Sequence, residues 1–155
     1  MMVAFTKADK VTTLRKIRFT FNEISKTNLP NLIKEMKNMV AHRKPVIRAE
    51  IGIIVKELQK LTRRVGTDLS FKPLLDKLNT ELNYWLNLDA EMKKMTAENF
   101  KEVKKNALVN LIGRNNVDMG TGRVNTSWKT NPGGKYKYIL DFLVQYDAEI
   151  KAIAA

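Results

Sequence analysis

The stretch that decides the fold is PVIRAEIGIIVKELQKLTRRVG, residues 45–66. Its apolar side chains recur at alternating steps of four and three residues, at Ile47, Ile51, Ile54, Leu58, Leu61 and Val65. This spacing places them on one face of an α-helix. Arg63 and Arg64, followed by Gly66, mark its carboxyl end. Three heptads are short for an independent coiled coil, so the pattern favours an element of a helical bundle, with a seam between subunits as the alternative.

Apolar residues also recur at helical spacing in the part of the chain before residue 45. Thr6 is a suitable N-cap for a first helix, whose apolar face consists of Val11, Leu14, Ile17, Phe21 and Ile24. Polar and apolar residues also alternate within residues 14–24, so a half-buried strand remains open there. A second helix is expected from about Asn28, with Pro30 in its first turn, and should end before Pro45. Its buried residues would be Leu32, Ile33, Met36, Met39 and Val40.

The same periodicity continues in the second half of the chain. Ser70 should cap a helix that ends near Leu88, and Asp89 should cap a short successor. Thr96 should open another helix, which Gly113 stops. A tail helix is expected over residues 139–153. The sequence therefore predicts a mainly α fold, a bundle of about five or six helices, and the 155 residues fit a single domain.

Residues 113–138 form a glycine-rich, basic insertion between the last two predicted helices. Irregular segments of this length inside a domain are usually functional or disordered. Apolar and polar residues alternate from Val124 to Thr130, and Asn131-Pro132-Gly133-Gly134 has the composition of a tight turn. We therefore expect a small β-hairpin at about 122–140, with its return strand starting at Lys135.

Composition limits where the protein works. There is no cysteine, so neither disulfides nor thiolate metal sites can form. The apolar amino-terminal stretch is too short for a secretory signal, and no run approaches the roughly 18 to 20 apolar residues of a membrane span. We expect a cytoplasmic protein, or one assembled there into a particle.

The charge points to a polyanionic partner. The formal net charge is +12, and residues 1–70 hold 15 Lys and Arg against 6 acids. Such an excess attracts nucleic acid. A merely soluble, lysine-rich surface is the alternative.

Two groups of cations are candidate nucleic-acid contacts. The first combines cations with aromatic rings that could stack on bases: Arg114, Arg123, Lys129, Lys135 and Lys137 with Trp128, Tyr136 and Tyr138. Alternatively, these rings are buried against the bundle. The second group lies near predicted helix ends: Arg15, Lys16, Arg18, Arg43, Lys44, Arg63 and Arg64. Cations there also favour the helix dipole.

Catalytic patterns are weak. The sole histidine, His42, is flanked by cations, and no Ser or Cys partner is indicated. Glu-x-Lys triplets of nuclease type begin at Glu35, Glu91 and Glu149, but each lies in a predicted helix. The glycine spacings match no nucleotide-binding fingerprint. We expect no enzyme activity, no cofactor and no metal site.

One short stretch resembles a known family. Gly120-Thr121-Gly122-Arg123-Val124-Asn125-Thr126-Ser127-Trp128 follows an amphipathic helix. It is similar to the Thr-Gly-Arg-Leu-x-x-Ser-Ile/Trp stretch of tailed-phage neck and tail-completion proteins. The resemblance implies an α+β domain that forms rings joining head to tail, and only Thr121, Gly122 and Arg123 carry it. Val117-Asp118-Met119 replaces the usual Ala-Pro.

These observations favour a non-enzymatic structural component of a nucleoprotein assembly. The resemblance narrows this to a phage virion, as a neck or other minor structural protein. Its basic surfaces would face nucleic acid, and it would self-associate or bind other assembly proteins, without a membrane or small-molecule substrate. The alternatives are a free-standing DNA- or RNA-binding regulator and a small nuclease.

Overall fold

The computed structural model describes residues 7–37, 44–65 and 72–154. Its elements follow the order α1 (Lys7–Glu23), η1 (Ile24–Asn28), α2 (Leu29–Lys37), α3 (Lys44–Val65), α4 (Lys72–Lys93), α5 (Phe100–Ile112), η4 (Arg114–Asn116) and α6 (Gly134–Ala154). The predicted mainly α bundle is confirmed. Several residues of the sequence predictions lie outside the described ranges: Thr6, Met39, Val40, His42, Arg43, Gly66, Ser70 and Phe71.

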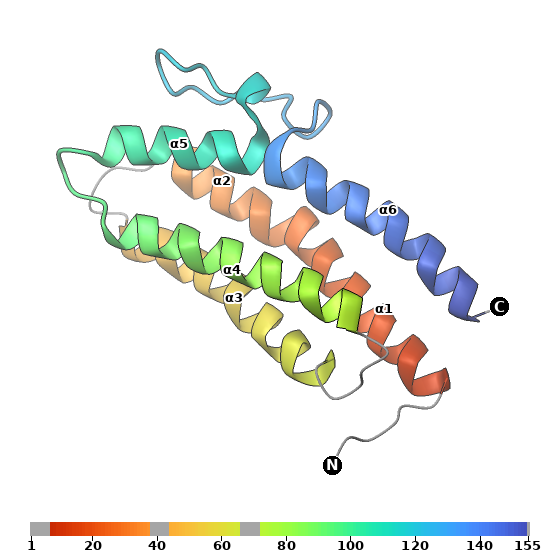
Figure 1. The fold of residues 1–155 in the computed structure, drawn as a ribbon. Coiled ribbons are helices and arrows are strands. Elements are labelled where there is room, and N and C mark those ends of the chain that lie inside the picture. The colour runs from red at the N-terminus through yellow and green to blue at the C-terminus, as the bar shows by residue number, and fades with distance from the viewer. Residues whose placement is uncertain (1–6, 38–43, 66–71, 155) are drawn as a thin grey trace.

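The apolar seam of α3 is buried by the chain itself. Each of its six residues, from Ile47 to Val65, is at most 2% exposed. Helix α4 lies alongside α3, and α1 and α2 also contact it (Figure 1). The interpretation of this stretch as a bundle element is therefore confirmed, and a seam between subunits is not needed to explain it.

The first two predicted helices form one continuous rod, in which α1 leads through η1 into α2. The strand alternative for residues 14–24 is wrong, because Ile17 and Phe21 are buried while Phe19 is 62% exposed, as a helix requires. The predicted break near Asn28 is also absent. Instead, η1 is a π-helical turn in which the Leu29 N–H donates to the Ile24 carbonyl. Such a wide turn just ahead of Pro30 accommodates a residue that has no N–H to donate.

Helix α4 is longer than expected. The prediction that Asp89 caps a new helix is wrong, because α4 continues to Lys93. Trp85, Leu88 and Met92 are buried, so the apolar face extends past Asp89 without interruption. The Asp89 carboxylate instead accepts two hydrogen bonds from the Arg48 guanidinium, at 3.0 and 3.2 Å, which joins α4 to α3.

Helix α5 begins at Phe100, later than predicted. Thr96 stabilises the turn that precedes this helix, because the Thr96 and Asn99 side chains each accept a hydrogen bond from the other residue's backbone N–H. Gly113, with φ of +93°, ends α5 as expected. None of the described helices is long and apolar enough to cross a membrane.

The predicted β-hairpin at about 122–140 is wrong. Residues 126–130 form turns, in which the Ser127 N–H donates to Asn125 Oδ1 and the Asn131 N–H to the Ser127 carbonyl. These local bonds replace those a strand would need. The expected return strand is the first part of α6, since Tyr136, Ile139 and Phe142 are buried at helical spacing. The described residues contain one isolated antiparallel bridge, Val117 to Val124, and no strand.

Candidate nucleic-acid interface

Residues 113–133, here called the 113–133 loop, leave the end of α5 and return to it before α6 begins (Figure 1). Glycines make the closure possible. A Cβ on Gly113 would lie 2.8 Å from the Gly133 Cα, and one on Gly134 would lie 2.6 Å from the Asn110 carbonyl oxygen. Gly134 also has a φ of +59°. The two ends of the loop therefore meet at a contact that larger residues would prevent.

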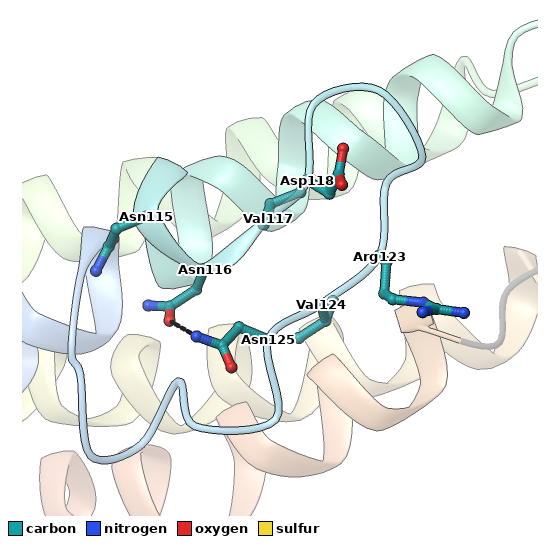
Figure 2. Close-up of a pocket in the computed structure, with 7 residues that line it drawn as sticks. All are labelled: Asn115, Asn116, Val117, Asp118, Arg123, Val124 and Asn125. Carbon is teal, nitrogen blue, oxygen red and sulfur yellow. Dashed lines mark hydrogen bonds between the residues drawn. The ribbon is translucent and has the colours of Figure 1, made fainter.

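Asn116 holds the loop together from the inside. Its side chain is 1% exposed, and its Nδ2 donates to the carbonyls of Ile112 and Asn131, each at 2.8 Å. Its Oδ1 accepts a hydrogen bond from Asn125 Nδ2 at 3.4 Å (Figure 2). One buried amide thus links α5, the returning chain and the middle of the loop. This role of Asn116 could not be predicted, because nothing in the local sequence distinguishes it from the neighbouring Asn115.

The tip of the loop is a tight turn fixed by Asp118. The Asp118 N–H donates to the Arg123 carbonyl, and the Asp118 Oδ1 accepts the N–H groups of Gly120 and Thr121 at 2.8 and 3.1 Å. These backbone hydrogen bonds, that of Thr121 first, lower the pKa of the Asp118 carboxyl. Gly122 takes a φ of +76° to complete the turn. The tip therefore presents Thr121 and Arg123 to solvent, with Arg123 pointing away from the Asn116–Asn125 pair in Figure 2.

A groove of about 550 Å³ separates the tip from the first turns of α5, and we call it the α5–loop groove. Its walls are Phe100, Lys101, Glu102, Lys104, Lys105, Gly120, Thr121 and Gly122. Three lysines therefore face one carboxylate.

The lysines of this groove differ in their contacts. The Lys105 Nζ donates to the Met119 carbonyl at 2.9 Å and lies 3.5 Å from a Glu102 carboxylate oxygen, which fixes the tip against α5. Lys101 and Lys104 make no hydrogen bond or ion pair with the described residues. None of these three lysines was among the predicted nucleic-acid contacts, although their i, i+3, i+4 spacing places them on one face of a helix.

Two of the predicted aromatic contacts are buried. Trp128 is 7% and Tyr136 9% exposed, and their rings meet edge to face with centroids 4.8 Å apart. Their faces are therefore unavailable to bases, and the alternative of burial against the bundle is the arrangement observed. Lys129 remains exposed, with its Nζ 5.6 Å from the Trp128 ring centroid. Arg114 on η4 is also exposed.

Lys135 is directed into the bundle. Its Nζ lies 2.5 Å from the Oε1 of Glu81, a residue that is 2% exposed, and 4.3 Å from the ring centroids of both Tyr84 and Tyr138. Burial, and secondarily the Glu81 charge, raises the pKa of both tyrosines. Lys137, by contrast, is exposed and pairs with Asp141 on its own helix at 2.8 Å. Glu81 was also missed, although an acid between Leu78 and Trp85 on the apolar face signals a buried pair.

The second predicted group does not form one cluster. Arg15 and Lys16 are exposed on α1, and Arg64 reaches this helix by donating to Thr13 Oγ1 at 3.4 Å. Arg63, the residue before Arg64, is exposed. Lys44 begins the same 22-residue helix, which places it about 30 Å from Arg64.

Lys44 and Arg18, like Arg64, also have partners. The Lys44 Nζ donates to the Met95 carbonyl at 3.0 Å. Arg18 forms a bidentate ion pair with Asp147, which raises the pKa of its guanidinium.

The possible catalytic groups are dispersed. Glu35, Glu91 and Glu149 lie on α2, α4 and α6 respectively. Within the described ranges, no three His, Cys, Asp or Glu side chains are grouped to hold a metal ion. No protein-family model matches the chain, and no curated protein or solved structure matches it.

Proposed function

We propose that this chain is a non-enzymatic structural component of a nucleoprotein assembly, and that its α5–loop groove binds the phosphate backbone of nucleic acid. The observation that carries the proposal is the groove itself. Lys101 and Lys104, on one wall, form no ion pair with a described acid, and the glycine-rich tip forms the other wall. A lysine ammonium binds phosphate as a point charge, and several together release counter-ions from a polyanion.

The buried aromatic rings favour contact with the backbone over contact with bases. Because Trp128 and Tyr136 pack on each other inside the protein, two of the three predicted rings are withdrawn from bases, and Tyr138, which is 43% exposed, is left as the single stacking surface of this group. Lys101, Lys104, Arg114, Arg123 and Lys129 remain as contacts to phosphates. Phosphate contacts position a protein on a duplex without reading its sequence. We therefore propose binding to duplex nucleic acid with little sequence preference.

The residues at the loop tip support the proposed place of the chain in an assembly. Thr121, Gly122 and Arg123, which carry the resemblance to tailed-phage neck and tail-completion proteins, occupy the tip beside the groove. A tip in this position can contact a neighbouring subunit while the lysines of the groove face nucleic acid. The described residues form no strand, so the α+β domain that the resemblance implies is not found in them. The proposed role as a neck or other minor structural protein of a virion assembled in the cytoplasm is therefore supported by these three tip residues alone.

Size-exclusion chromatography with light scattering tests both parts of the proposal. The protein would be run at low and high salt, with and without a duplex DNA fragment of mixed sequence. We expect a self-associated species without DNA, and a DNA complex that forms at low salt and dissociates at high salt. A monomer that binds one sequence far more tightly than others would instead identify a regulator.

A metal-supplemented incubation of the same duplex tests the nuclease alternative. We expect the DNA to remain intact. Cleavage that is lost on replacing Glu35, Glu91 or Glu149 with Gln would overturn the non-enzymatic role.

In the chromatography experiment, absence of any DNA complex at low salt would refute the role of the α5–loop groove.

A further inference from the structure

A second groove lies between α1 and α6, and we call it the α1–α6 groove. It encloses about 570 Å³ and is lined by Arg15, Arg18, Phe19, Asp147, Ile150 and Lys151. None of these residues belongs to the α5–loop groove. Its volume falls within the roughly 300–1,000 Å³ typical of binding pockets.

Phe19 is the unusual residue of this groove. It is 62% exposed, whereas Ile17 and Phe21 on the same helix are buried at 0% and 1%. Ile150, opposite on α6, is only partly buried. An aromatic ring left exposed in a groove and surrounded by charges resembles the anchor of a protein interface, where aromatic residues and arginine are enriched.

The charges around Phe19 are not balanced. Asp147 is engaged by Arg18, through Nε to Oδ1 and through Nη2 to Oδ2 at 3.5 Å. Arg15 and Lys151 make no hydrogen bond or ion pair with the part of the chain that the structure describes. The groove therefore has two positive charges in excess beside its apolar residues.

We propose that the α1–α6 groove docks an acidic segment of a partner protein. An apolar side chain of that segment packs against Phe19 and Ile150, and its carboxylates pair with Arg15 and Lys151. Arginine suits this role because its guanidinium can bind a carboxylate through two hydrogen bonds. Nucleic acid fits less well, since the groove places an aliphatic side chain, Ile150, opposite Phe19, and an aliphatic side chain has no ring face on which a base can stack. The site goes beyond the proposed nucleic-acid function and does not depend on it.

Fluorescence anisotropy with a short labelled peptide tests the docking site. The probe is an amphipathic peptide of glutamate and leucine, and the full chain is titrated into it. Two comparison peptides replace all glutamates by glutamine or all leucines by serine. A labelled single-stranded oligonucleotide serves as the competing class of ligand.

We expect the glutamate–leucine peptide to bind and both comparison peptides to bind more weakly. Phe19→Ser should weaken binding about tenfold or more, as loss of an interface anchor does. Arg15→Gln combined with Lys151→Gln should have a similar effect, and Lys26→Gln, an exposed lysine outside the groove, should have none. Because Phe19 is exposed, Phe19→Ser should fold, and circular dichroism checks this.

Three results would overturn the proposal. The first is failure of the wild-type chain to bind the acidic peptide, and the second is equal binding by Phe19→Ser. The third is loss of oligonucleotide binding, but not peptide binding, in the groove variants. Duplex DNA binding through the α5–loop groove should be unchanged by Phe19→Ser, so failure of one site is distinguishable from failure of the other.

Discussion

Replacing Lys135 with methionine should destabilise the fold strongly without weakening DNA binding. Lys135 has 11% of its side chain exposed, and its Nζ is 2.5 Å from the Oε1 of Glu81, which is 2% exposed. The other carboxylate oxygen of Glu81 has no hydrogen-bond partner among the described residues. The variant would leave this carboxylate buried and uncompensated, which typically costs about 3–5 kcal/mol. For a chain of this length the loss corresponds to a fall in Tm of roughly 10 °C.

Chemical and thermal denaturation of a double-mutant cycle measure this effect. Glu81→Leu with Lys135→Met should recover most of the lost stability, because replacing a whole buried ion pair by apolar residues is often neutral. The salt dependence of duplex binding should be the same in all folded members of the cycle. A cost below about 1 kcal/mol for Lys135→Met, together with weaker DNA binding, would refute the reasoning and return Lys135 to the nucleic-acid surface.

Three further perturbations test the loop and its base. Trp128→Ala should cost about 3–5 kcal/mol in denaturant unfolding and leave the salt dependence of DNA binding unchanged, since the ring is buried. Gly134→Ala should destabilise the fold by more than about 1 kcal/mol, because the φ of Gly134 is +59° and a Cβ would meet the Asn110 carbonyl oxygen. Gly52 has open space around it, so Gly52→Ala should stabilise the fold by about 0.5–1 kcal/mol. Equal changes in the free energy of unfolding of the two variants would contradict this reasoning. The Asp118 carboxyl has a lowered pKa, so its contribution to the turn is complete above its ordinary value of 3.8 and is lost as pH falls through the folded value. NMR of the two amides bonded to it should show this loss at acid pH, and Asp118→Ala should abolish the transition.

Much of the fold was predictable, because burial and helical periodicity agree. The steps of four and three from Ile47 to Val65 located α3, and each of those residues is buried. Gly113 marked the end of α5 for the reason expected, a positive φ. Errors arose where a local pattern had two readings. Tyr136 and Tyr138 alternate with lysines as a strand would, yet the deciding spacing was Tyr136 to Ile139 to Phe142, which is helical.

The candidate site was less predictable, because it depends on contacts between distant parts of the chain. Nothing in the sequence near Lys135 indicates that its ammonium pairs with the carboxylate of Glu81, more than fifty residues earlier. Lys101 and Lys104 looked like ordinary members of a solvated helix face. They line a groove because Lys105 holds the loop tip, and Asn116 the base of the loop, against α5, and no local sequence pattern predicts such contacts.

The salt dependence of duplex DNA binding tests the central proposal most directly. The variant Lys101→Gln/Lys104→Gln/Arg123→Gln would be compared with Lys26→Gln/Lys56→Gln/Lys60→Gln, which removes equal charge from exposed positions outside the groove. If each of the three residues contacts a phosphate, the slope of log Kobs against log salt should fall in magnitude by about 2.7, which is 0.9 per contact. The charge-matched control should retain the wild-type slope. An unchanged slope in the variant of the two groove lysines and the neighbouring tip residue Arg123, or an equal fall in the control, would contradict nucleic-acid binding at the α5–loop groove and its tip.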